Sequence, residues 1–200
     1  LGIKKKSYEY NFPENIWTRI FHQEGIKAKL ECLAREKFEN AKQITIQIVF
    51  SPTTKQLLGA QVIGEDGADK RLDILATLVK NKATIYDLME VEHAYAPPYS
   101  SAKDPVNMAG FVADNLVNQL LKVTQWDTFE DECKNASNAL LIDVRNPDEF
   151  ARGSITGATN IPLDELRSHL ESISKNKSLF IFCEIGLRGY LAQRILTQSG

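Results

Sequence analysis

The strongest chemical signal in the sequence is Cys183, which ends an apolar run and precedes a short glycine-containing loop. The run Leu179–Cys183 is typical of a buried strand, and a helix is expected over Gly189–Leu196. In α/β folds, sites gather where strands end. The backbone N–H groups of such a loop form a nest for an anion, which the positive helix terminus reinforces. With Arg188 nearby, these groups favour the thiolate, so Cys183 is predicted to be a nucleophile.

The length of this loop narrows the chemistry that Cys183 could perform. The residues between Cys183 and Arg188 are Glu184, Ile185, Gly186 and Leu187. Cysteine phosphatases carry one residue more there, which makes room for a tetrahedral phosphate. The shorter loop suits a single bound sulfur atom, and Gly186 lets it close tightly. We therefore expect a persulfide, Cys183–S–S⁻, stabilised by the loop N–H groups.

A second motif lies upstream of this loop. Residues 141–150 read LIDVRNPDEF, and residues 153–162 read GSITGATNIP. Together with the cysteine loop, these segments closely resemble the rhodanese signature over residues 126–200. The resemblance implies a sulfurtransferase on a parallel-sheet α/β fold.

The rhodanese resemblance also implies roles for charged residues, and this sequence differs from the family pattern at two points. It places Asp143, Arg145 and Glu149 in a network that supports the site. The histidine that is common after the first glycine of the second segment is Ser154 here. The family usually continues with a further strand and helix after the point where this sequence stops, at Gly200, so we expect a truncated domain.

Three segments before this region carry a separate resemblance. Residues 57–64 read LLGAQVIG, residues 68–73 read ADKRLD and residues 95–107 read YAPPYSSAKDPVN. They are similar to the dimerisation domain of flavin-dependent pyridine nucleotide-disulfide reductases, in the coenzyme A-disulfide reductase branch. Some members of that branch carry a C-terminal rhodanese domain. The resemblance implies a homodimer in which Tyr95 reaches the partner's redox cysteine, with FAD, NAD(P)H and coenzyme A used by the full-length protein.

The expected fold is mixed α/β and α+β, with a dimerisation domain over 1–122 and a rhodanese-like domain over 126–200. A hairpin is predicted at residues 44–63, followed by helices at Asp69–Lys80, through Met89 after a cap at Thr84 with Asp87 in the first turn, and from Pro105 to about Lys122. Later elements are strands at Ala139–Val144 and Leu179–Cys183 and helices at Phe129–Lys134 and Pro162–Ile173. Residues 14–42 have a loosely helical spacing broken at Gly25, and residues 11–42 do not match the family.

Composition excludes several classes. Lys and Arg number 24 against 26 Asp and Glu, for a net charge of −2, so no basic excess supports nucleic-acid binding. The apolar runs are too short to cross a membrane. Three cysteines cannot form a disulfide framework without leaving one unpaired, which favours a reducing, cytoplasmic location.

The sequence offers no cofactor or metal site of its own. A glycine-rich dinucleotide fingerprint is absent, because Gly64-Glu65-Asp66-Gly67 reads only as a turn. The flavin and nicotinamide domains are therefore expected before residue 1, and no cofactor is expected on this chain alone. His22, His93 and His169 are isolated, so no metal site is predicted.

Alternatives remain for the cysteines and for the function. Cys183 could be a buried, inert residue, although its place at a strand end argues otherwise. Cys32, expected on a helix, and Cys133 have no such setting. One rival function is a rhodanese fold without turnover that only docks a persulfide carrier. The other is a cysteine phosphatase or arsenate reductase, against which the shorter loop argues.

Overall fold

The computed structural model describes residues 26–32, 44–95, 102–124, 126–136 and 138–200. The chain divides into two compact units: residues 26–30, 45–95 and 102–111 of the described chain belong to the first, and residues 31–32, 44 and 112 onwards belong to the second. The domain boundary expected at residues 123–127 stays a prediction. Among the described stretches, no helix is both long enough and apolar enough to cross a membrane.

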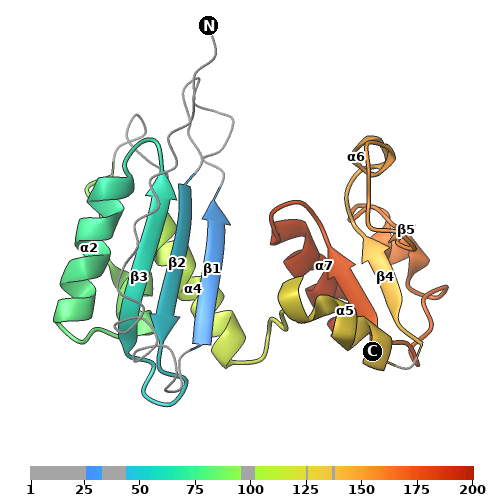
Figure 1. Cartoon of the computed structure of the whole chain (residues 1–200), viewed down its shortest axis with the longest axis horizontal. Helices are drawn as coiled ribbons and strands as arrows, with labels where there is room; N and C mark the ends of the chain where they lie inside the picture. Colours follow the sequence, from blue (N-terminus) through green and yellow to red (C-terminus); the bar gives the residue numbers. More distant parts are fainter. Residues whose placement is uncertain (1–25, 33–43, 96–101, 125, 137) are drawn as a thin grey trace, which may run out of the picture. The chain divides into compact units, whose positions relative to one another are not determined.

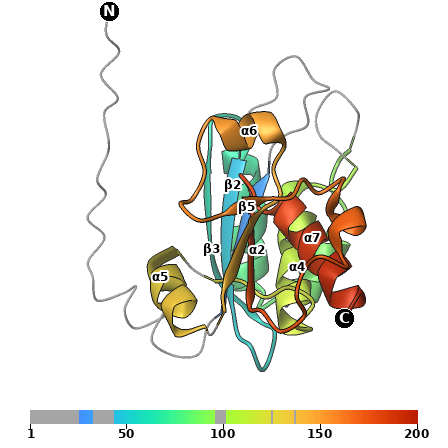
Figure 2. The same ribbon diagram turned by 90° about the vertical axis from the view of Figure 1, so that its right-hand side faces the viewer.

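The first unit is built on a three-stranded sheet in the order β1-β2-β3. Its strands are β1 (Ile26–Cys32), β2 (Ile44–Phe50) and β3 (Leu57–Gly64), and neighbouring arrows run in opposite directions in Figure 1. Helix α2 (Ala68–Lys80) packs on β3 and covers one face of the sheet (Figures 1 and 2). The predicted hairpin and the helix after it are confirmed.

Strand β1 corrects a prediction. Residues 26–32 were expected to be helical, and Cys32 was expected on that helix, but the segment IKAKLEC is a strand. Apolar residues occupy every second position of this segment, which is the period of a strand with one apolar face. Reading residues 14–42 as one window concealed this alternation. The remainder of that window lies outside the described residues.

Two further helices follow α2, and the division between residues 111 and 112 falls within the second of them. Helix α3 (Ile85–Glu90) begins with the predicted cap, in which Thr84 and Asp87 exchange hydrogen bonds with each other's backbone N–H. Helix α4 (Pro105–Val117) begins as predicted but ends before Lys122. Its end is marked by Gln119, whose φ of 56° is left-handed.

The second unit contains a parallel sheet, as predicted, and its strands lie in the order β5-β4-β6. Its strands are β4 (Leu140–Asp143), β5 (Thr159–Asn160) and β6 (Leu179–Phe182). Asp143 pairs with Phe182, so β4 and β6 end level with each other. Cys183 and Arg145 therefore follow neighbouring strands at the same edge of the sheet, where sites of parallel sheets gather.

The helices of this unit are α5 (Trp126–Asn135), α6 (Pro147–Ala151) and α7 (Leu187–Gln198). The long helix predicted over Pro162–Ile173 is wrong, because only a short 3-10 helix, η1 (Leu166–His169), forms there. Backbone N–H groups in this stretch bond carbonyls three residues back, and the hydroxyls of Ser168 and Ser172 also bond carbonyls three residues back. Such local bonds compete with a regular α-helix.

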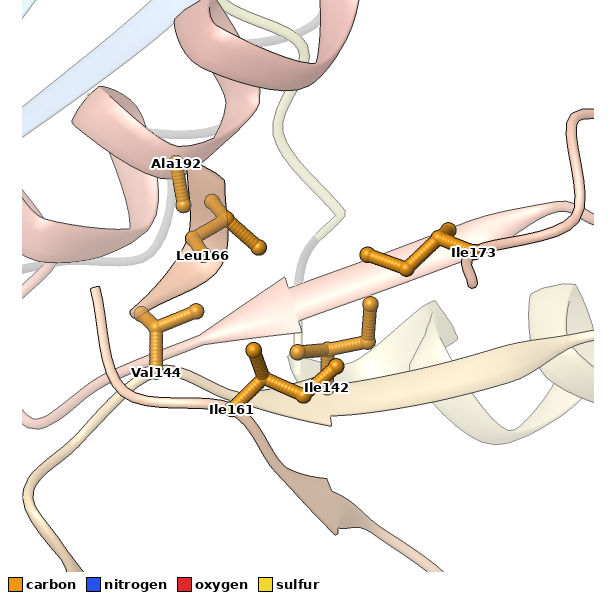
Figure 3. Packing of buried hydrophobic residues seen from close by; sticks show 6 residues of the cluster. All are labelled: Ile142, Val144, Ile161, Leu166, Ile173 and Ala192. Atoms are coloured by element: carbon orange, nitrogen blue, oxygen red, sulfur yellow. The ribbon is translucent and has the colours of Figure 1, made fainter. Parts of the chain in front are cut away.

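The core of the second unit lies between the sheet and α7. Its buried members are Ile142, Val144, Ile161, Leu166, Ile173 and Ala192 (Figure 3). Ala192 is the contact from α7, and its small side chain lets the helix approach the strands. This packing fixes the first turn of α7 beside the end of β6 and so positions the cysteine loop.

Candidate functional site

The sulfur of Cys183 is held by backbone donors. Cys183 directly follows β6 and is half-buried. Its Sγ accepts hydrogen bonds from the N–H of Gly186 at 3.1 Å and of Gly189 at 3.4 Å. Both donors are backbone N–H groups at the start of α7, so the positive end of this helix lies at the sulfur.

Glycine is required at one position of this loop. Gly186 precedes the first residue of α7 and has a φ of 107°, which L side chains rarely adopt. Gly189 contributes the second donor, although it lies beyond the residues predicted to line the cradle. A Cβ at Gly189 would lie 4.0 Å from Cys183 Sγ, so the helix backbone passes close to the sulfur. A second glycine three residues after the first was the signal that sequence reasoning missed.

The other loop residues face away from close contact with the sulfur. Glu184 and Leu187 are exposed, and Ile185 is half-buried. Within the described residues, only the N–H groups of Gly186 and Gly189 bond to Cys183 Sγ. Of the N–H groups of residues 184–187, that of Gly186 bonds the sulfur, and the persulfide cradle stays a prediction.

Arg188 is paired with a carboxylate. Its Nη1 and Nη2 donate to Glu149 Oε2 and Oε1 at 2.6 and 2.7 Å, which ties α6 to α7. The backbone N–H of Asn146 also donates to Glu149 at 3.0 Å. Hydrogen bonds from Arg188 and then from Asn146 lower the pKa of Glu149 to about 2. The same pair raises the pKa of Arg188. Arg188 therefore acts on Cys183 through a charge that Glu149 partly neutralises.

Asp143 anchors a second polar network. Its side chain is fully buried and accepts from Ser154 Oγ at 2.7 Å and from the backbone and guanidinium of Arg145 at 2.7 to 3.1 Å. Burial acts to raise the pKa of Asp143, but the bonds from Arg145 and Ser154 outweigh it, and the pKa is lowered. Arg145 also donates to the carbonyl of Gly153 at 2.7 Å. Ser154 thus has a structural partner at the position where a histidine is common.

The charges around the sulfur sum to a negative value. Arg145 pairs with Asp143, and Arg188 pairs with Glu149, so each cation has its own carboxylate. Glu184 is the fifth charged group and influences both arginines from the loop. A thiolate at Cys183 would add further negative charge. This net negative charge disfavours a substrate with two negative charges close to its reacting atom.

The remaining candidate residues lie elsewhere. Tyr95 is half exposed, and residues 96–101 of the motif that follows it lie outside the described residues. Cys133 is on α5, where burial and then Glu132 raise its pKa. Within the described ranges, no group of His, Cys, Asp and Glu side chains could hold a metal ion.

Comparison with known proteins identifies both halves of the chain. Residues 21–105 match the family model described as pyridine nucleotide-disulphide oxidoreductase, dimerisation domain. Residues 126–200 match the model described as rhodanese-like domain. The two matches follow each other along the chain in this order. The family resemblance, the domain order and the fold class predicted from the motifs are thereby confirmed.

Individual relatives match parts or most of the chain. A coenzyme A disulfide reductase of Staphylococcus epidermidis is 44% identical over 68 residues, which are 34% of this chain and 16% of that protein. The crystal structure of reduced Bacillus anthracis CoADR-RHD is 40% identical with a TM-score of 0.85, over 94% of this chain and 33% of that one. A NAD-dependent persulfide reductase from A. fulgidus is 30% identical with a TM-score of 0.77, over 88% and 31%.

These relatives define the context of the site. The chain spans about a third of the length of each of the two solved relatives. Their names describe disulfide and persulfide reductases, and the matching regions of this chain include a rhodanese-like domain.

Proposed function

We propose that this chain supplies the sulfur-transfer half of a coenzyme A-disulfide, persulfide or polysulfide reductase, with Cys183 as the sulfur carrier. The observation that carries the proposal is the hydrogen bonding of Cys183 Sγ to the N–H groups of Gly186 and Gly189. Backbone donors of this kind stabilise charge on sulfur without requiring a second acidic or basic side chain. Half-burial leaves the sulfur open to a small donor.

The proposed reaction has two displacement steps. The Cys183 thiolate attacks the outer sulfur of a persulfide R–S–SH, the S–S bond of the donor breaks, and R–SH leaves with the proton. The enzyme then holds Cys183–S–S⁻. An acceptor thiolate, from coenzyme A or another small thiol, attacks the terminal sulfur, which gives R′–S–S⁻ and restores the Cys183 thiolate.

In the proposed reaction, the charged residues hold the site in place and place a positive charge near the sulfur. Arg188 is held by Glu149 at the first turn of α7, so it keeps a fixed positive charge near the persulfide. Arg145 and Asp143 hold the end of β4 level with Cys183. In this proposal Arg188 supports the charge of the persulfide, and the other three residues are positioning residues.

The full-length protein would complete the cycle. FAD and NAD(P)H, bound outside residues 1–200, would reduce the persulfide or disulfide product. The dimerisation domain would pair two copies, with Tyr95 directed towards the redox cysteine of the partner. The matches to the dimerisation-domain model and to the NAD-dependent persulfide reductase support this context. We place the protein in the cytoplasm, with no nucleic-acid or membrane partner.

Cyanide distinguishes this proposal from a docking module without turnover. Cyanide attacks the terminal sulfur of Cys183–S–S⁻ and yields thiocyanate and the Cys183 thiolate. Chain loaded with polysulfide should release about one thiocyanate per Cys183, and Cys183→Ser should release none. Cys133→Ser is the matched control and should behave as wild type. Wild-type chain that releases no thiocyanate would leave only a docking role.

A further inference from the structure

A buried polar network joins separate segments of the first unit. Asp104 is 1% exposed, and Arg71 of α2 donates to its carboxylate from Nε at 3.3 Å and from Nη2 at 2.8 Å. The backbone N–H of Val106 also donates to Asp104 Oδ1, at 3.1 Å. Asn107 is 2% exposed, and its Oδ1 accepts from the backbone N–H of Asp104 at 3.1 Å. The network therefore ties the start of α4 to α2.

The same network holds the chain where it leaves α3. The side-chain amide of Asn107 donates to the carbonyls of Leu88 and Val91 at 3.0 Å each. Residues 91–95, which we call the arm, follow α3 directly and have no regular secondary structure. The arm therefore starts at a point fixed by α4, and His93 lies in its middle.

His93 brings a titratable ring to this network. Its Nε2 atom is buried, and no group in the described part of the chain forms a hydrogen bond with it. The charged groups around the ring are Asp104 before α4, Lys70 and Arg71 on α2, and Glu92 beside it in the arm. Burial lowers the pKa of His93, Asp104 acts against this effect, and Lys70 and Arg71 add to it. The folded chain therefore favours the neutral ring.

Protonation of His93 would be unfavourable at this place for two reasons. A protonated imidazole carries N–H groups on both nitrogens, so the buried Nε2 would be a donor without an acceptor among the described residues. The added charge would also lie near the cations of Lys70 and Arg71. The buried carboxylate that attracts this charge, Asp104, already accepts from Arg71. Both costs fall when the ring enters water, which hydrates the charge.

We propose that His93 is a pH-sensitive latch: the neutral ring keeps the arm on the polar network, and uptake of one proton releases residues 92–95 into solvent. The hydrogen bond from Asn107 to the carbonyl of Val91 stays in place, so the release begins after Val91. Tyr95 lies at the end of the arm and loosens with it. The latch goes beyond the sulfur transfer proposed for Cys183, and its consequence is that weak acid loosens the tyrosine proposed to reach the partner subunit.

Nitrogen-15 relaxation of the 200-residue chain tests the latch directly. Backbone order parameters of residues 92–95 should fall from about 0.85 near pH 7.5 to below about 0.6 near pH 5, with the midpoint at which the His93 ring titrates. His93→Gln cannot take up the proton and should keep the arm ordered at both pH values. Lys70→Gln removes a cation beside the ring and should move both midpoints to higher pH. Lys80→Gln removes another exposed cation of α2 and is the control, with midpoints as in wild type.

Unfolding measured against pH is a second test. Because the fold lowers the pKa of His93 from 6.5, the stability contributed by its neutral ring is complete above pH 6.5 and is lost as the pH falls below it. Below pH 6.5, wild type should therefore lose stability faster than His93→Gln. An arm that stays ordered near pH 5 in wild type, or that loosens equally in His93→Gln, would overturn the inference. Neither result depends on sulfur loading of Cys183, so failure of the latch is distinct from failure of the proposed function.

Discussion

Replacing Gly186 by alanine tests the loop geometry at the residue that the backbone constrains most. With φ at 107°, an alanine at this position adopts a strained conformation, and an added Cβ would meet no atom within 4 Å. The whole cost is therefore backbone strain, about 1–3 kcal/mol. The rhodanese-like unit either keeps the loop and loses this amount from its free energy of unfolding, or relaxes the loop and loses the N–H donor to Cys183 Sγ.

The assay separates these two responses. Denaturant unfolding gives the stability change, and the rate of sulfur loading at Cys183 gives the functional change. Because 1.4 kcal/mol corresponds to a factor of ten, a relaxed loop should load sulfur about 5- to 100-fold more slowly. Gly189→Ala is the matched control for stability, because its added Cβ would make ordinary contacts at 3.9–4.0 Å with Ile181 and Cys183. Since alanine favours the helix over glycine, the free energy of unfolding should stay the same or rise by up to about 1 kcal/mol. A Gly186→Ala chain with wild-type stability and wild-type loading would refute the reasoning.

Three further outcomes are expected. Glu184→Gln should raise kcat/KM for thiosulfate a few-fold, because the exposed carboxylate next to the cradle repels this dianion, although solvent screens the repulsion. Glu165→Gln is the control and should have no effect. An unchanged or lower kcat/KM in Glu184→Gln would contradict this prediction. The pKa of Glu149 is lowered from 4.5 to about 2, so its stabilising pairing is fully present above pH 4.5 and is lost as the pH falls towards 2. Unfolding measured across that window should show a shallower loss for Glu149→Gln than for wild type, and parallel curves would argue against the pairing. Ser154→Ala should lower the free energy of unfolding by about 1–2 kcal/mol, because the buried carboxylate of Asp143 loses a hydrogen-bond donor at 2.7 Å. If calorimetry finds no change, the hydrogen bonds from Arg145 alone hold Asp143 in place.

The elements that position the site could be predicted because their sequence patterns are local. The continuous apolar runs before Asp143 and Cys183 indicated buried parallel strands, and both are found. The capping residues Thr84 and Asp87 marked a helix start correctly. Such signals depend on neighbouring residues and need no knowledge of tertiary contacts.

Other features depended on contacts between distant segments. The pairing of Arg188 with Glu149 joins residues 39 positions apart, and neither spacing nor composition reveals that the two side chains meet. The contact of Gly189 with the sulfur arises from packing of α7 through Ala192, which a loop-centred interpretation omits. Strand β1 was missed because charged residues on its alternate positions resembled a mixed-charge helix within a long window.

Mass spectrometry of the chain after polysulfide treatment tests the central claim most directly. We expect a reducible increment of about 32 Da, the mass of one sulfur, on the peptide that contains Cys183 and not on the peptides that contain Cys32 or Cys133. The same increment spread equally over the three cysteines, or no increment on Cys183, would contradict a sulfur-carrying loop.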